Sequence, residues 1–223
     1  MTTIKVNSEQ VPYHIHKGLI AQHSEYFDRA FKDDSKEAKN GIVILEHITC
    51  HTCMSFKVVV TCGFANIKPV NIFVSWLYTR KLPRKCTEWI EIQNLDDISH
   101  RGFERAMLRV RDFADHYLIP ALGQIFECAF IGYMANESRP CYETISYAYE
   151  NLCLKCPILQ AMVDSHCHFS KSDSDGDVDG ELEARSKLPH CFLINVMNRY
   201  AKIIKSKDEL TLHIRDYHNH SSE

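Results

Sequence analysis

The sequence predicts an α+β fold in which a small β-sheet near the N-terminus is covered by helices. Residues 4–6 and 11–15 alternate apolar with polar side chains around a polar turn at 7–10, as in a hairpin with one buried face. Farther along, apolar residues recur every three or four positions, as they do in amphipathic helices. A chain of 223 residues with 45% hydrophobic content is also long and apolar enough to bury one substantial core.

The strand alternation stops at Lys17-Gly18, and helical spacing begins there. Ser24 is well placed to cap a further helix, because its side-chain oxygen can accept a hydrogen bond from a backbone N–H in the first turn. Phe27 and Phe31 stand four residues apart and would share one face of that helix. We therefore expect the hairpin to lead directly into a pair of helices.

Two longer helices are predicted between residues 107 and 133. Apolar residues at 107–117 keep helical spacing, and Pro120 fits the first turn of the next helix, where its missing N–H costs nothing. The second helix carries an apolar stripe: Leu122, Ile125, Phe126, Ala129, Phe130 and Tyr133. An amphipathic helix must bury such a face, so we interpret the stripe as core and not as a site.

Four blocks of the chain, at 16–31, 31–46, 73–79 and 110–122, carry a further pattern. Its residues are His16, Lys17, Ser24, Tyr26, Phe27, Trp76, Leu77, Tyr78, Asp115 and Pro120. Together the blocks resemble the BTB/POZ domain, a protein–protein interaction fold, especially in its fungal form. The resemblance implies that Ile42 to Leu45 adds a strand to the sheet and that these residues build the domain.

The resemblance also implies a function. BTB/POZ domains are typically homodimeric or adaptor modules, and some serve cullin-based ubiquitin ligases. We therefore expect a non-enzymatic adaptor or scaffold that binds protein partners, including a second copy of itself, with a cullin among the partners that the resemblance implies. We identify no zinc-finger array, Kelch repeat or MATH domain in the sequence, which weakens the substrate-adaptor version.

Other function classes find little support in the sequence. There is no glycine-rich phosphate loop, no G-x-S-x-G elbow and no H-E-x-x-H helix, so we expect neither an enzyme nor a cofactor. The 26 basic and 29 acidic residues give a net charge of −3, which argues against nucleic-acid binding. No apolar segment reaches the roughly 20 residues that cross a bilayer, so we expect an intracellular protein of the cytoplasm, the nucleus or both.

The ten cysteines raise the question of metal binding. We expect them to be reduced, and two pairs, Cys50 with Cys53 and Cys153 with Cys156, have the two-residue gap of zinc ligands. In four-cysteine zinc sites the pairs stand about 12 to 20 residues apart, whereas these pairs are about a hundred residues apart. We therefore expect no metal there and keep the four cysteines as weak candidates.

An acidic segment resembles a calcium-binding loop in part. Carboxylates occupy the first, third and fifth loop positions: Asp175, Asp177 and Asp179. Gly180 occupies the sixth position, but Ser186 stands at the twelfth, where a bidentate glutamate normally closes the calcium shell. We interpret 170–187 as a solvated acidic linker, because it has too few apolar residues to order itself.

These motifs leave a second class of function open. The alternative is a metal-responsive binding protein that holds calcium in the acidic loop 173–183 or zinc at the cysteine pairs. Light scattering with and without a chelator separates it from a scaffold whose oligomeric state does not depend on metal.

The predicted organisation has one main domain and an extension. The BTB/POZ-like domain covers 1–136, and within it 49–68 departs from the family pattern as a loop insertion, which a retained intron in the gene sequence would explain. A helical C-terminal extension covers 137–207 and contains the linker 170–187. The tail, 208–223, is polar and should fray.

The extension ends in a helix that opens at Leu188-Pro189. Its apolar stripe consists of Phe192, Leu193, Val196, Met197, Tyr200, Ile203 and Ile204. We expect this stripe to pack on another surface, because left in water it would promote association.

Overall fold

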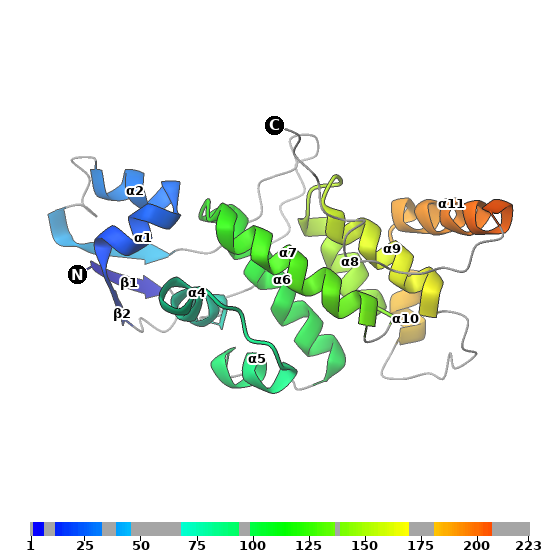
Figure 1. The fold of residues 1–223 in the computed structure, drawn as a ribbon, viewed down its shortest axis with the longest axis horizontal. Coiled ribbons are helices and arrows are strands. Elements are labelled where there is room, and N and C mark those ends of the chain that lie inside the picture. Colours follow the sequence, from blue (N-terminus) through cyan, green and yellow to red (C-terminus); the bar gives the residue numbers. More distant parts are fainter. Residues whose placement is uncertain are drawn as a thin grey trace. The chain divides into compact units, whose positions relative to one another are not determined.

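The computed structural model describes residues 2–6, 12–32, 39–45, 68–93, 99–136, 139–169 and 181–206 (Figure 1). In these ranges the chain is mostly helical with one three-stranded sheet, so the α+β class is confirmed. The strands are β1 (Thr2–Val6), β2 (Pro12–Ile15) and β3 (Ile42–Leu45). The helices are α1 (Lys17–His23), α2 (Glu25–Lys32), α4 (Lys68–Thr79), α5 (Cys86–Gln93), α6 (His100–His116), α7 (Pro120–Asn136), α8 (Tyr142–Asn151), α9 (Pro157–Phe169), α10 (Glu181–Ser186) and α11 (His190–Ser206).

The sheet has the order β2-β1-β3 and is mixed. β1 pairs with β2 in antiparallel register, with Thr2 opposite Ile15, and with β3 in parallel register. Gly41 leads into β3 with a φ of +63°, and its carbonyl accepts hydrogen bonds from the Thr3 N–H and the Thr2 hydroxyl, each at 2.8 Å. The predicted hairpin and third strand are thus present.

The chain divides into two compact units. The first comprises residues 1–98 and 106–126, and the second comprises 99–105 and 127–223. This division differs from the predicted boundary after residue 136, because α6 and α7 each contribute residues to both units. We describe each unit by itself.

The core of the first unit is aromatic. The Phe27 ring stacks on Phe73, with centroids 6.3 Å apart, and on Tyr117, with centroids 5.6 Å apart. Trp76 and Phe113 are also almost fully buried there. Such pairs add stabilisation beyond the area they bury, so this stack joins α2, α4 and the end of α6.

The turn between α6 and α7 occurs where the sequence predicts it. Leu118 adopts a left-handed φ of 50°, and the Ile119 N–H then donates to the Ala114 carbonyl at 2.8 Å, which closes the end of α6. Pro120 begins α7. The helix break thus follows from a left-handed cap and a proline in succession.

In the second unit α9 is buried along most of its length, and Phe192 of α11 packs its ring on Tyr149 and His166. Part of the predicted linker is helical, because 181–186 form α10. Glu181 accepts a hydrogen bond from the Tyr142 N–H at 3.2 Å, and Ala184 is buried. These tertiary contacts order a segment whose composition alone predicts solvation.

Within the described ranges, none of the helices combines the length and the apolar character needed to cross a membrane. The predicted insertion at 49–68 lies outside the described residues except for Lys68, which begins α4. The predicted tail at 208–223 also lies outside them.

Candidate functional site

Ser24 ties two segments of the first unit together. It lies between α1 and α2 and is only 2% exposed. Its hydroxyl donates to the Tyr117 carbonyl at 2.5 Å and accepts from the Phe27 N–H at 3.2 Å. The second bond is the predicted helix cap, and the first joins α2 to the end of α6.

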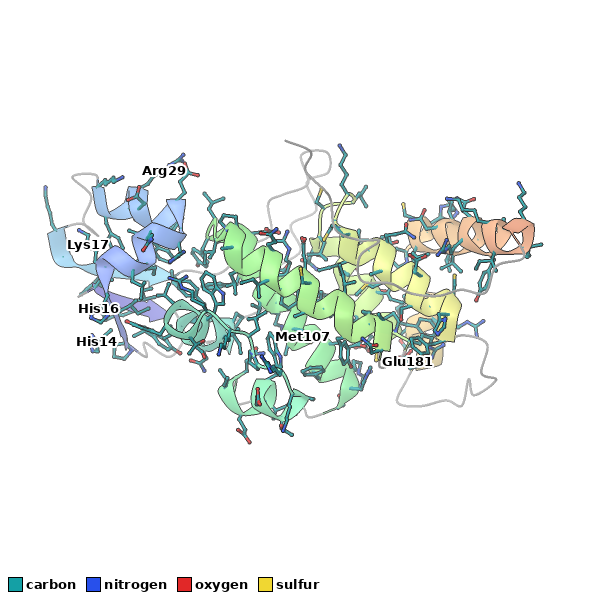
Figure 2. The ribbon with its side chains drawn as sticks, in the orientation of Figure 1. His14, His16, Lys17, Arg29, Met107 and Glu181 are labelled. Atoms are coloured by element: carbon teal, nitrogen blue, oxygen red, sulfur yellow. The ribbon has the colours of Figure 1, made fainter. Side chains whose placement is uncertain are left out.

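His16 and Lys17 make comparable links at the start of α1 (Figure 2). The Tyr78 hydroxyl lies 2.9 Å from His16 Nδ1 and 3.3 Å from the His16 backbone N–H. Lys17 Nζ donates to the Phe31 carbonyl at 3.4 Å and lies 5.1 Å from the centre of the Phe31 ring. These side chains therefore join α1 to α4 and to α2.

The other signature residues also support packing. Trp76 and Leu77 are buried in α4, and Tyr26 packs edge-on against Tyr117 with ring centroids 5.1 Å apart. Asp115 pairs with Arg111 one turn earlier in α6. Pro120 begins α7.

Of the metal-ligand candidates that the sequence suggests, most lie outside the described residues. Cys50, Cys53, Asp175, Asp177 and Asp179 lie outside the described residues.

Cys153 is exposed and Cys156 is buried, and the Cys156 thiol faces Glu127 Oε1 at 3.8 Å. Among the described residues, neither cysteine belongs to a group of three metal-binding side chains. No disulfide joins the cysteines of the described ranges.

One such group does exist, in the second unit, at residues that the sequence analysis did not select. His100 and Glu104 lie four residues apart on one face of α6, and Cys141 immediately precedes α8. His100 Nδ1 is 3.4 Å from Glu104 Oε1 and 3.4 Å from Cys141 Sγ. The three donor atoms all lie within 4.8 Å of one another, and we call these residues the His-Glu-Cys cluster.

Glu104 is fully buried in this cluster. Its Oε2 accepts a hydrogen bond from the Cys141 N–H at 3.0 Å, and the Thr144 hydroxyl and the Cys141 thiol also lie close to the carboxyl group, whereas its Oε1 makes no hydrogen bond of good geometry among the described residues. Burial raises the pKa of Glu104, and the nearby His100 opposes that rise. The protein thus holds a carboxyl group away from water with one oxygen that lacks a well-formed hydrogen bond.

Cys141 is not prepared for attack as a nucleophile. Burial raises the pKa of its thiol well above the ordinary value, and the negative fields of Glu104 and Glu181 raise it further. The geometry agrees, because Glu104 and Cys141 face the same nitrogen of His100. A catalytic triad needs the carboxylate and the nucleophile on opposite ring nitrogens.

The second nitrogen of His100 has another partner. The Tyr133 hydroxyl, from α7, lies 2.5 Å from His100 Nε2. This bond fixes the orientation of the ring and directs Nδ1 towards the other two donors.

A cavity of about 230 Å³ adjoins the cluster. It is lined by Ser99, His100, Arg101, Arg139, Pro140, Cys141 and Glu181. The His-x-x-x-Glu spacing on an amphipathic helix was the only sequence signal for this region, since Cys141 stands 37 residues beyond Glu104.

No protein-family model matches the chain, and no curated protein is similar to it in sequence. Function is therefore inferred from the residues themselves.

Proposed function

We propose that the protein is a non-enzymatic protein–protein interaction module of the BTB/POZ type that self-associates. The observation that carries this proposal is an exposed apolar face on α11. Phe192 and Val196 of that helix are buried, but Leu193, Ile194, Met197 and Ile204 are 42%, 42%, 71% and 78% exposed. We call these four residues the α11 face.

The α11 face corrects part of a prediction. The sequence predicts that the whole stripe packs on another surface. Within the chain Phe192 and Val196 are buried and Tyr200 and Ile203 are half-buried, whereas Leu193, Met197 and Ile204 are exposed. Large apolar side chains that gather on one side of a surface helix mark interaction sites more often than scattered ones do.

A second copy of the chain is the partner that suits this face. The four side chains carry no charge, so two copies can meet across a twofold axis without like-charge repulsion. Burying the exposed part of Met197 or Ile204 would contribute about 1–2 kcal/mol per side chain to the free energy of association. In a symmetric dimer each side chain is buried once in each subunit, so each contribution occurs twice.

The first unit supports the BTB/POZ part of the proposal. A hairpin, two short helices, a third strand and the helix with Trp76-Leu77-Tyr78 follow in the order that the resemblance implies. The contacts of Ser24, His16 and Lys17 are those of residues that build a domain.

Light scattering coupled to size exclusion tests self-association. We expect the full chain to elute at twice its 25.8 kDa and to dissociate on dilution. Met197→Lys and Ile204→Lys keep a long helix-forming side chain but place a charge in the interface, so each should weaken dimerisation by at least about 10-fold. Chelator in the buffer removes any metal-bridged species.

Asn198→Lys is the matched control, because it adds the same charge to the same helix at an exposed polar residue. It should leave the dimer intact. A monomeric wild-type protein, or variants at 197 and 204 that dimerise as well as the control, would overturn the proposal.

A further inference from the structure

We propose that His100, Glu104 and Cys141 bind one zinc ion, with the fourth coordination position facing the adjoining cavity. The proposal does not depend on self-association, because the cluster lies on α6 and at the start of α8 and shares no residue with the α11 face.

The distances fit a tetrahedral zinc site. Zinc lies about 2.0 Å from a histidine nitrogen, about 2.3 Å from a thiolate sulfur and about 2.1 Å from a carboxylate oxygen, so nitrogen should stand about 3.5 Å from sulfur and about 3.4 Å from oxygen. In the cluster His100 Nδ1 is 3.4 Å from Cys141 Sγ and 3.4 Å from Glu104 Oε1. The third pair, Cys141 Sγ and a carboxylate oxygen of Glu104, lies within 4.8 Å, so the ligands close on an ion with movements of about 1 Å.

The weakly bonded Oε1 of Glu104 is a further reason to expect an ion. A buried carboxylate oxygen without a partner is destabilising, and native proteins rarely keep one without a cause. Oε1 is the oxygen directed at His100, whereas Oε2 is held by the Cys141 N–H. A cation between Nδ1, Sγ and Oε1 satisfies it.

The charge and the ligand types select zinc. One thiolate and one carboxylate neutralise a dication, and neutral imidazole completes a nitrogen, oxygen and sulfur set that zinc accepts. Calcium and magnesium require oxygen ligands throughout, so they do not match a site with a thiolate.

The surroundings support the ligands. Tyr133 holds His100 Nε2, as outer groups do for most metal-binding histidines. The cavity of about 230 Å³ leaves room for a water molecule as the fourth ligand.

The experiment uses the full chain without a histidine tag. After dialysis against zinc and then buffer, elemental analysis should find one zinc ion per chain. Cobalt in its place should give the near-ultraviolet charge-transfer band of a thiolate ligand. His100→Gln, Glu104→Gln and Cys141→Ser should each weaken zinc binding by more than about 10-fold, since each removes one of three ligands.

Two sets of controls locate the ion. The double variant Cys50→Ser with Cys53→Ser, and the variant Cys153→Ser, should keep both the zinc and the cobalt band, because none of these thiols is among the three proposed ligands. Circular dichroism checks that each ligand variant keeps its helices.

Tyr133→Phe keeps all three ligands and removes only the hydroxyl that orients His100. We expect zinc binding to be about 10- to 100-fold weaker in this variant. If a ligand variant fails to fold, Tyr133→Phe still tests the site, because it changes none of the three ligands. A chain that binds no zinc would overturn the proposal, and so would zinc that survives Cys141→Ser or disappears only with the Cys50 and Cys53 pair.

Discussion

Replacing Ser24 by alanine should destabilise the first unit more than any surface hydroxyl can. The side chain is 2% exposed and serves two backbone groups, the Tyr117 carbonyl and the Phe27 N–H. Alanine leaves both without their side-chain partner, and the space that the lost oxygen leaves is too small to admit a water molecule.

The magnitude follows from those two bonds. Loss of a helix cap costs about 0.5–2 kcal/mol, and a buried carbonyl left without a donor costs about 1–3 kcal/mol. We expect the free energy of unfolding to fall by about 2–4 kcal/mol, allowing for some overlap between the two terms.

Urea unfolding followed by tryptophan fluorescence is the suitable assay. The two tryptophans of the chain, Trp76 and Trp89, are both buried in the first unit, so their emission reports on that unit. Thr79→Ala is the control, because its exposed hydroxyl donates to the Ser75 carbonyl at 2.8 Å and water can replace it. If Ser24→Ala cost less than about 0.5 kcal/mol, like the control, the reasoning would be refuted.

Three further predictions can be tested by the same urea unfolding experiment. Leu118→Gly should raise the unfolding free energy by about 0.5–1 kcal/mol, because glycine adopts the left-handed φ of 50° without strain and Leu118 is exposed; a loss of stability would contradict this. Gly123→Ala should raise the unfolding free energy by up to about 1 kcal/mol, because alanine has the higher helix propensity. The new Cβ would lie 2.7 Å from Arg111 Nη1, but this atom is the end of a flexible side chain that can move away. A net loss of stability would show that Arg111 cannot move. Partial burial, and after it the charge of Arg80, lower the pKa of His23, so the folded state favours the neutral imidazole. The contribution of His23 to stability should therefore be complete above about pH 6.5 and should be lost as the pH falls towards the lowered pKa. His23→Gln should remove this loss of stability at low pH, and a stability-versus-pH curve unchanged by the substitution would contradict the prediction.

Local pattern predicted much of the fold. The alternation before Ile15 predicted the hairpin, the cap at Ser24 predicted the start of α2, and Pro120 predicted the start of α7. Each of these signals acts within a few residues, so it can be read without knowing what packs where.

Long-range contacts account for what was missed. α10 forms in a segment of polar composition because Glu181 accepts a hydrogen bond from Tyr142 and Ala184 is buried, both within the second unit. The His-Glu-Cys cluster needs Cys141 beside Glu104, 37 residues apart, and nothing in the spacing of either residue indicates the other. Periodicity shows which face of a helix is buried but not which helix will cover it.

The separation of Glu104 from Cys141 also sets an order of events during synthesis. At about 5–20 residues per second, the ribosome adds Cys141 about 2 to 7 s after Glu104. Until then neither the Cys141 thiol nor α8 can lie beside the first turns of α6, so these groups cannot yet shield the Glu104 carboxylate from water. Dehydration of that carboxylate is therefore a late step of maturation, and any zinc supplied to the nascent chain earlier would meet only two of its three ligands.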